Sequence, residues 1–310
     1  MLNIIGKRYW FFALSALIII PGVIIMAIWG LPLSIDFKGG NRLEVQFPSG
    51  KIPETSKVYQ MYSEMGITDP QVFTSGTDGL VITTPQLTQD QSIKALDSLN
   101  KLAGETVVVR QESNVSPVIG QELVSRALLT LGLTSLALVL FITFSFRGVE
   151  NALHYGIATV VALIHDVLVI FSILSIGGRI WGWQVDTLFL TALLTVIAFS
   201  AQDTIVVFDR MRENSNIFRR LEFETLLNHS VVQTLSRSIN TQLMTVDFLL
   251  LALALFGGVT LKEFAITLIV GMISGSYSSI FIAAPFLVIW KNKEWRNWFH
   301  RKGQSQAVTS

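Results

Sequence analysis

The sequence contains no cysteine among its 310 residues. Disulfide bonds, thiolate metal sites and cysteine nucleophiles are therefore excluded. Charged residues are also scarce, at 15% of the chain, whereas about a quarter of a typical soluble domain is charged. The 23 basic and 22 acidic residues nearly cancel, so nothing in the composition favours binding to nucleic acid. Hydrophobic residues make up 51% and gather in long blocks, which indicates a membrane protein.

The motifs of common enzymes are missing as well. The sequence has no Gly-rich phosphate loop, no nucleophile elbow and no HExxH motif. Its 4 histidines are scattered without the spacing of metal ligands. The run DFKGG at 36–40 follows an apolar block and precedes a predicted strand, so we interpret it as a tight turn rather than a phosphate cradle. We expect no enzymatic activity, no metal and no cofactor.

The apolar blocks predict six transmembrane helices, each long enough or nearly long enough to cross the hydrocarbon core. They lie at residues 10–29, 127–146, 153–176, 186–208, 241–257 and 264–290. The first block is too long for a signal peptide and has no small-residue cleavage site, so we expect a retained anchor. Lys and Arg gather on one side, at 7–8, 210–220 and 291–302. The positive-inside rule therefore places both termini in the cytoplasm.

The polar segment between the first two blocks predicts a folded exterior domain. Apolar residues alternate at 41–47, 71–74 and 80–83 as in strands, and a last strand fits 105–110. Helical spacing occurs at 55–65 and 88–102. The order βαββαβ is that of a ferredoxin-like α+β fold, which identifies no activity by itself.

We therefore divide the chain into four parts. Residues 1–30 form the cytoplasmic N-terminus and first transmembrane helix, and residues 31–124 form the exterior α+β domain. Residues 125–290 form a bundle of five transmembrane helices, and residues 291–310 form a cytoplasmic tail. Within the bundle, the mixture of apolar and basic residues at 211–227 predicts an amphipathic helix on the inner leaflet.

Acidic residues inside the apolar blocks are the candidate functional residues. A charged side chain at the bilayer centre costs roughly 2.5–3.5 kcal/mol on insertion scales, so it needs a partner or a function. Asp203 has small and polar neighbours, and Arg237 lies at the start of the fifth block. We predict that Asp203 and Arg237 form a proton relay. A positive-inside anchor remains the alternative for Arg237.

Further candidates are weaker. His165 and Asp166 are adjacent, so at most one should face a given neighbour, and a hydrogen bond between helices is favoured slightly over a relay. Asp247 is a second intramembrane acid without an evident partner. Small residues recur every fourth position at Gly271, Gly275 and Ser279. This strip predicts close helix packing, either within the bundle or at a seam with another subunit.

Several of these runs are shared with a known family. They are DFKGG at 36–40, VSPVIGQEL at 115–123, ALIHDV at 162–167, SAQDTIVVFDRMREN at 200–214, TLSRSINT at 234–241 and GSYSSIFIAAP at 275–285. With them, the chain from 36 to 290 resembles the SecF family, the membrane subunits of the bacterial Sec protein translocase (SecDF, RND superfamily). The resemblance implies location in the bacterial cytoplasmic (inner) membrane.

The resemblance also implies partners and a function. The expected partners are SecD, the SecYEG translocon, YajC, YidC and preprotein substrates, with no nucleic acid. SecDF is held to use the proton-motive force to draw preproteins out of the channel through movement of its exterior domains. The family's intramembrane aspartate falls on Asp203 and its arginine on Arg237. Ala201 and Gln202 depart from the family's usual S-I-N-D-T run, which changes the polar group beside the carboxylate.

Two other functions remain open from the sequence. The chain could be a structural assembly subunit, in which buried charges only hold helices in register. It could also be one half of an RND-type exporter of small molecules.

Overall fold

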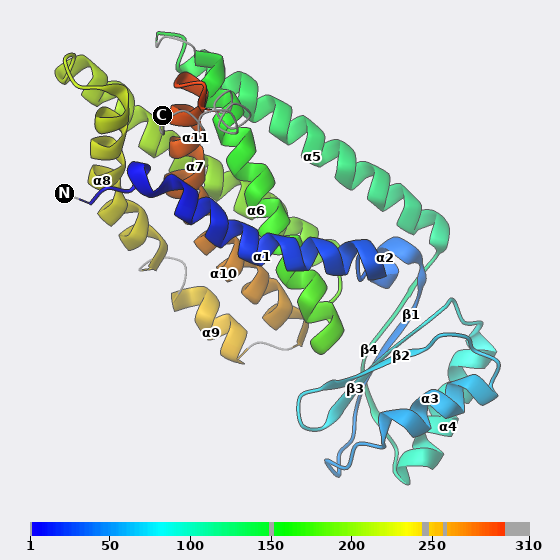
Figure 1. Cartoon of the computed structure of the whole chain (residues 1–310). Helices are drawn as coiled ribbons and strands as arrows, with labels where there is room; N and C mark the ends of the chain where they lie inside the picture. The colour runs from blue at the N-terminus through cyan, green and yellow to red at the C-terminus, as the bar shows by residue number, and fades with distance from the viewer. Residues whose placement is uncertain (1, 149–151, 244–247, 257–258, 295–310) are drawn as a thin grey trace, which may run out of the picture.

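A computed structural model describes residues 2–148, 152–243, 248–256 and 259–294 of the chain. It consists of a bundle of long helices and a smaller α/β domain at one end of that bundle (Figure 1). At the opposite end, Arg8 forms ion pairs with Glu224 at 3.0 Å and Glu294 at 2.6 Å. The start of the chain, the start of α8 and the end of the last described helix therefore meet at one place.

Five helical segments in the described ranges are long and apolar enough to span a membrane. They comprise α1 (Arg8–Trp29), preceded by a short 3-10 turn, α5 (Pro117–Ser145), α6 (Ala152–Ile180), α7 (Thr187–Ile217), and a last segment formed by α10 (Val259–Ser278), a π-helical turn (Ser279–Ala283) and α11 (Ala284–Lys291). The first four expected spans and the last one thus correspond to helices of the structure.

The fifth expected span, at 241–257, has no single counterpart. α8 (Phe223–Gln242) is too polar to qualify, and α9 (Phe248–Phe256) has nine residues. The part at 244–247 lies outside the described residues. A sixth span therefore stays a prediction.

The prediction of one amphipathic helix at 211–227 is wrong. α7 continues to Ile217, and α8 begins at Phe223. The physical reason is that the chain turns at 218–222. Met211 and Leu226, on either side of the turn, pack in one hydrophobic cluster inside the bundle, whereas Ile217, Phe218 and Leu221 stay exposed. Asn214 also donates from Nδ2 to the hydroxyl of Ser230 on α8, at 2.9 Å. This segment is a helical hairpin rather than a surface helix.

The α/β domain contains a four-stranded antiparallel sheet in the order β2-β3-β1-β4. Its elements are β1 (Gly40–Gln46), α3 (Thr55–Glu64), β2 (Gln71–Ser75), β3 (Gly79–Thr84), α4 (Gln89–Ala103) and β4 (Val108–Val115). Val45, Tyr62 and Leu99 are among the buried residues that join the helices to the sheet. Burial raises the pKa of Tyr62 to about 12, as expected for a hydroxyl in an apolar core.

The run at 36–40 does more than turn the chain. It overlaps the short helix α2 (Ile35–Lys38), which ends at Gly39 with a φ of 78°. A Cβ on Gly39 would lie 2.6 Å from the nitrogen of Pro117, and one on Gly120 would lie 2.6 Å from the carbonyl oxygen of Phe37. Both glycines are needed because α2 lies directly against the start of α5.

The small-residue strip of the last span packs against α7. A Cβ on Gly271 would meet the side chain of Val196, and one on Gly275 would lie 3.0 Å from Cβ of Ser200. Further along, the hydroxyls of Ser279 and Thr204 are 2.8 Å apart. The strip therefore brings α10 close to α7 within this chain.

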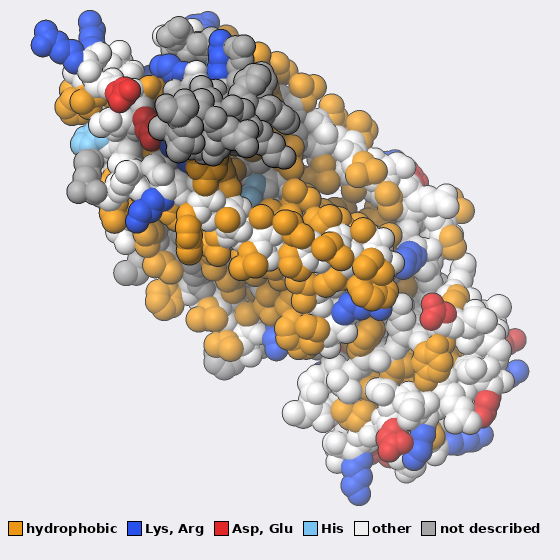
Figure 2. Space-filling model, viewed as in Figure 1, with side chains coloured by type: hydrophobic (Ala, Val, Ile, Leu, Met, Phe, Trp, Pro, Cys, Tyr) orange, Lys and Arg blue, Asp and Glu red, His pale blue; other side chains and the backbone are white. Residues whose placement is uncertain are grey.

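The outer surface of the bundle is apolar. Figure 2 shows hydrophobic side chains covering most of the visible face of the bundle, whereas charged groups gather at its ends and on the α/β domain. On α5, the side chains of Leu128, Leu133 and Phe144 are exposed. A surface of this kind suits the hydrocarbon of a membrane.

Substituting Gly271 with alanine should destabilise the bundle. The added methyl group overpacks the contact with Val196, which typically costs about 1–3 kcal/mol. Thermal unfolding of the purified protein in detergent measures the loss. Gly132→Ala is the matched control, because a Cβ there would meet no described atom within 4 Å. Equal melting temperatures for the two variants would contradict the packing role of Gly271.

Candidate functional site

The most enclosed charged group of the described chain is Asp166, in the middle of α6. Its side chain is 0% exposed. The hydroxyls of Ser200 on α7 and Ser278 on α10 donate to its Oδ2 at 2.6 and 2.7 Å, and Ser274 donates to Oδ1 at 2.7 Å. Hydrogen bonds to an ionised group are the stronger ones in proteins. Three such bonds from two other helices therefore hold α6, α7 and α10 together at this level.

His165 extends this network to α1. Its Nδ1 lies 3.2 Å from Oδ1 of Asp166, and its Nε2 lies 2.9 Å from the hydroxyl of Ser15. The ring stacks on Tyr277 with centroids 5.8 Å apart. His165 thus faces α1 and Asp166 faces α7 and α10, as expected of adjacent residues on a helix, and the contact between the two side chains joins them in one polar network.

Asp203, on α7, has a more open environment. It is half-buried, and its Oδ2 accepts hydrogen bonds from Ser276 at 2.6 Å and from Nε2 of Gln242 at 3.2 Å. The other amide atom of Gln242, Oε1, is buried and has no partner among the described residues. Asp203 therefore sits beside an unused hydrogen-bond acceptor.

Arg237 lies on α8, five residues before Gln242, which bonds to Asp203. Within the described residues, Arg237 and Asp203 form no direct ion pair. The side chain of Arg237 is exposed, as are those of Ser236, Asn240 and Thr241 around it. These side chains give α8 an exposed polar surface.

The other predicted residues divide between these two places and the helix contact. Gly271, Gly275 and Ser279 lie at the contact of α10 with α7. Asp247 lies outside the described residues. None of the described histidine and acidic side chains are grouped as a metal site would require.

Sequence reasoning missed the serines of α10. Ser274 and Ser278 are four residues apart, so they share a face of the helix and meet Asp166. Ser276, between them, points to Asp203 instead. The available signal was four serines within six residues of an otherwise apolar helix. A π-helical turn follows directly at Ser279–Ala283, and such turns are frequent at functional sites.

The N-terminus of α7 connects this region to the α/β domain. Asp186 caps the helix by accepting from the backbone N–H of Phe189 at 2.7 Å. Asp36 accepts from the backbone N–H and the hydroxyl of Thr187, both at 3.0 Å. Burial raises the pKa of Asp186, and the hydrogen bond from Phe189 opposes that rise. Negative groups are favourable at a helix N-terminus, so Asp36 ties the domain to α7.

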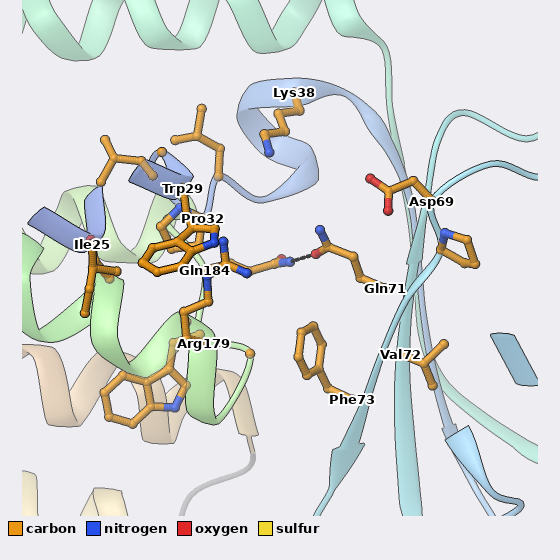
Figure 3. Close-up of a pocket in the computed structure, with 18 of the residues that line it drawn as sticks. Ile25, Trp29, Pro32, Lys38, Asp69, Gln71, Val72, Phe73, Arg179 and Gln184 are labelled. Carbon is orange, nitrogen blue, oxygen red and sulfur yellow. Dashed lines mark hydrogen bonds between the residues drawn. The ribbon is translucent and has the colours of Figure 1, made fainter. Parts of the chain in front are cut away.

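A cavity of about 570 Å³ separates the sheet edge from the bundle beside this joint. Figure 3 shows Gln71 and Gln184 pointing toward each other across it, with Nε2 of Gln184 donating to Oε1 of Gln71 at 3.2 Å. Next to them, a Cβ on Gly182 would lie 2.5 Å from the ring of Phe73. Two small contacts thus hold β2 against the turn between α6 and α7.

Comparison with known proteins identifies the family. The family model "Protein export membrane protein SecD/SecF, C-terminal" matches residues 95–293, and the "SecD/SecF GG Motif" matches residues 24–47. Protein translocase subunit SecF of Anaerolinea thermophila is 58% identical over 97% of this chain and 98% of its own length. The chain belongs to the SecF family of protein translocase subunits.

Other relatives of this SecF-family chain are longer. Protein translocase subunit SecDF of Bacillus subtilis is 32% identical, over 93% of this chain and 38% of its own length. The crystal structure of SecDF from Thermus thermophilus has a TM-score of 0.83 and 28% identity, covering 94% of this chain and 39% of that one. A SecDF structure in a super-membrane-facing form has a TM-score of 0.68 and covers 96% of this chain and 40% of that one.

Removing the serine hydroxyls around Asp166 should destabilise the protein. Ser274→Ala or Ser278→Ala removes a hydrogen bond to a buried charge, which costs about 1.5–3 kcal/mol. Unfolding in detergent, monitored by circular dichroism, measures the change. Ser175→Ala is the control. Ser175 is on α6, the helix that carries Asp166, and its buried hydroxyl has no hydrogen-bond partner among the described residues. If Ser175→Ala lowered the stability as much as the other two substitutions, the hydrogen bonds from the serines to Asp166 would not be the cause of the destabilisation.

Proposed function

We propose that this SecF-family chain acts with SecD to couple the proton-motive force to late steps of protein export through the Sec channel. The observation that carries the proposal is the half-buried carboxylate of Asp203, which has donors on one side and the exposed Arg237 nearby. Asp203 and Arg237 form the proton relay in this proposal. Asp166 and His165 hold the helices in register beside it, and Asp247 stays a weaker candidate.

Gln242 supports a change of protonation at Asp203. An amide side chain can donate through its NH₂ group or accept through its oxygen. In the described state the NH₂ group donates to the carboxylate. If Asp203 takes up a proton, the same amide can turn over and accept from the new O–H group. Both protonation states would then have a hydrogen-bond partner without a large rearrangement.

The energy available to such a relay is sufficient to move protein. One charge crossing 100 mV supplies about 2.3 kcal/mol, which shifts a two-state equilibrium by more than about tenfold. Asp203 is 16 residues from the first residue of α7, or roughly 24 Å along a helix. Because Asp36 bonds to that end of α7, repacking around Asp203 is expected to tilt the α/β domain.

The proposal includes the topology and partners expected from the sequence. The chain would cross the bacterial cytoplasmic membrane six times, with both termini in the cytoplasm and a ferredoxin-like domain outside. SecD would cover the polar surface of α8 around Arg237. The SecDF relatives support this arrangement, because this chain accounts for only 38% of the Bacillus subtilis protein. SecYEG, YajC, YidC and preproteins are the remaining proposed partners.

Conservative substitutions in the relay should abolish the energy-dependent part of export. Asp203→Asn removes the titrating group, and Arg237→Lys replaces the guanidinium, so each should reduce proton-driven export to the level of membranes without this chain. The measurement is translocation of a preprotein into membrane vesicles that contain SecD and SecYEG, with and without a proton gradient. Glu213→Gln is the control, because it removes an exposed charge from the same helix, α7. Membranes that contain this variant should export normally. Full export by Asp203→Asn would favour the structural assembly subunit instead.

Locking the joint of the domain should also stop the cycle. The chain has no cysteine, so Gln71→Cys with Gln184→Cys can be linked specifically by a short bis-methanethiosulfonate reagent. If the domain must move, export should fall on linking and recover when a reductant cleaves the linker. The single variant Gln71→Cys, treated identically, controls for modification alone. Export unchanged by complete linking would argue against movement at this joint.

A further inference from the structure

A second large cavity lies at the other end of the bundle from the α/β domain. Its volume is about 820 Å³. It is bounded by the start of α6, the end of α7, the start of α8 and the end of α11. None of the proposed relay residues line it, so its chemistry is independent of the export mechanism above.

The charged side chains that line this cavity have one sign. Four basic side chains line it: Arg212, Arg219, Lys291 and Lys293. No aspartate or glutamate is among the described lining residues. Two acids close in sequence to lining residues are already paired, Asp209 with Arg212 at 2.5 Å and Glu294 with Arg8 at 2.6 Å. The charges of Arg219, Lys291 and Lys293 are left without an ion-pair partner in the described chain.

The rest of the wall is apolar and aromatic. Phe218, Leu221, Phe223, Leu287 and Trp290 contribute to it. Nζ of Lys291 lies 4.0 Å from the ring centroid of Phe223, so a cation and an apolar face are directly adjacent. Trp and basic residues typically mark the boundary between hydrocarbon and water in membrane proteins. The cavity therefore combines a cationic rim with an apolar wall at the level of lipid headgroups.

We propose that this cavity binds an anionic glycerophospholipid from the leaflet at that end of the bundle. Its phosphate would contact Arg219, Lys291 and Lys293, and an acyl chain would lie along the apolar wall. Basic pockets between transmembrane helices are suited to anionic headgroups. A soluble phosphate would contact only the basic rim and leave the apolar wall unused. A zwitterionic lipid would add its own positive charge to a site that already has excess positive charge. Charge complementarity thus selects an anionic lipid.

The test compares phosphatidylglycerol with phosphatidylcholine on the full-length protein. Native mass spectrometry of protein extracted from vesicles that contain the two lipids in equal amounts counts the lipid retained. Wild-type protein should retain phosphatidylglycerol preferentially. Arg219→Gln and Lys293→Gln should each reduce that preference by about fivefold, as expected for one basic residue at an anionic surface. Adding inorganic phosphate should not displace the lipid.

The control is Arg220→Gln, which removes the same charge from an exposed position next to Arg219 but outside the cavity. It should keep the wild-type preference. An equal reduction by Arg220→Gln would mean that general surface charge attracts the lipid, and the proposal would be overturned. Absence of any preference in wild-type protein, or displacement by inorganic phosphate, would overturn it too.

A second measurement does not depend on removing a basic residue. Ser215 lines the cavity, so Ser215→Cys gives one labelling site in a chain that otherwise has no cysteine. A fluorophore at this position should be quenched at least twofold more by phosphatidylglycerol with brominated acyl chains than by the matching phosphatidylcholine. Equal quenching by the two lipids would contradict a selective site.

Discussion

The buried carboxylate of Asp166 sets the condition that the packing of the bundle must meet. A charge at this depth is stable only if other groups hydrogen-bond to it. Its three serine donors come from α7 and α10, so both helices must approach α6 at the same level. Such an approach requires small side chains, which Gly271 and Gly275 supply where α10 meets α7. The polar network and the small-residue strip are therefore two parts of one packing solution.

Asp203 is also a carboxylate inside the bundle, but fewer hydrogen-bond donors surround it than surround Asp166. Asp166 has donors on both carboxylate oxygens and no exposure, so a change in its charge would disrupt several helices together. Asp203 has two described donors on one oxygen and lies next to the polar surface of α8. In the proposed relay, a change of its protonation would therefore disturb fewer contacts of the fold. The division between a fixed and a changeable carboxylate is what a relay inside a stable bundle requires.

Much of this architecture was predictable from the sequence, because hydrophobic blocks and alternating strands are local signals. The strands near 41–47, 71–74 and 80–83 and four of the first five expected spans follow from them. The serine partners of Asp166 were not predictable, since they come from residues 34 to 112 positions away. The helix expected at 211–227 failed for the same reason. Met211 and Leu226 pack against other helices, whereas Ile217, Phe218 and Leu221 between them stay exposed, and periodicity alone does not reveal this division.

α7 is the element that physically connects these features. Its first turn is bonded to Asp36 of α2, its middle carries Ser200 and Asp203, and its last turns reach the cationic cavity near Ser215. A continuous helix transmits a shift at its centre to both ends, because its backbone hydrogen bonds keep it stiff. Repacking at Asp203 would therefore displace both ends of α7, one at the joint with the α/β domain and the other at the cationic cavity. A lipid held in that cavity would then bias the same movement that the proposed relay would drive.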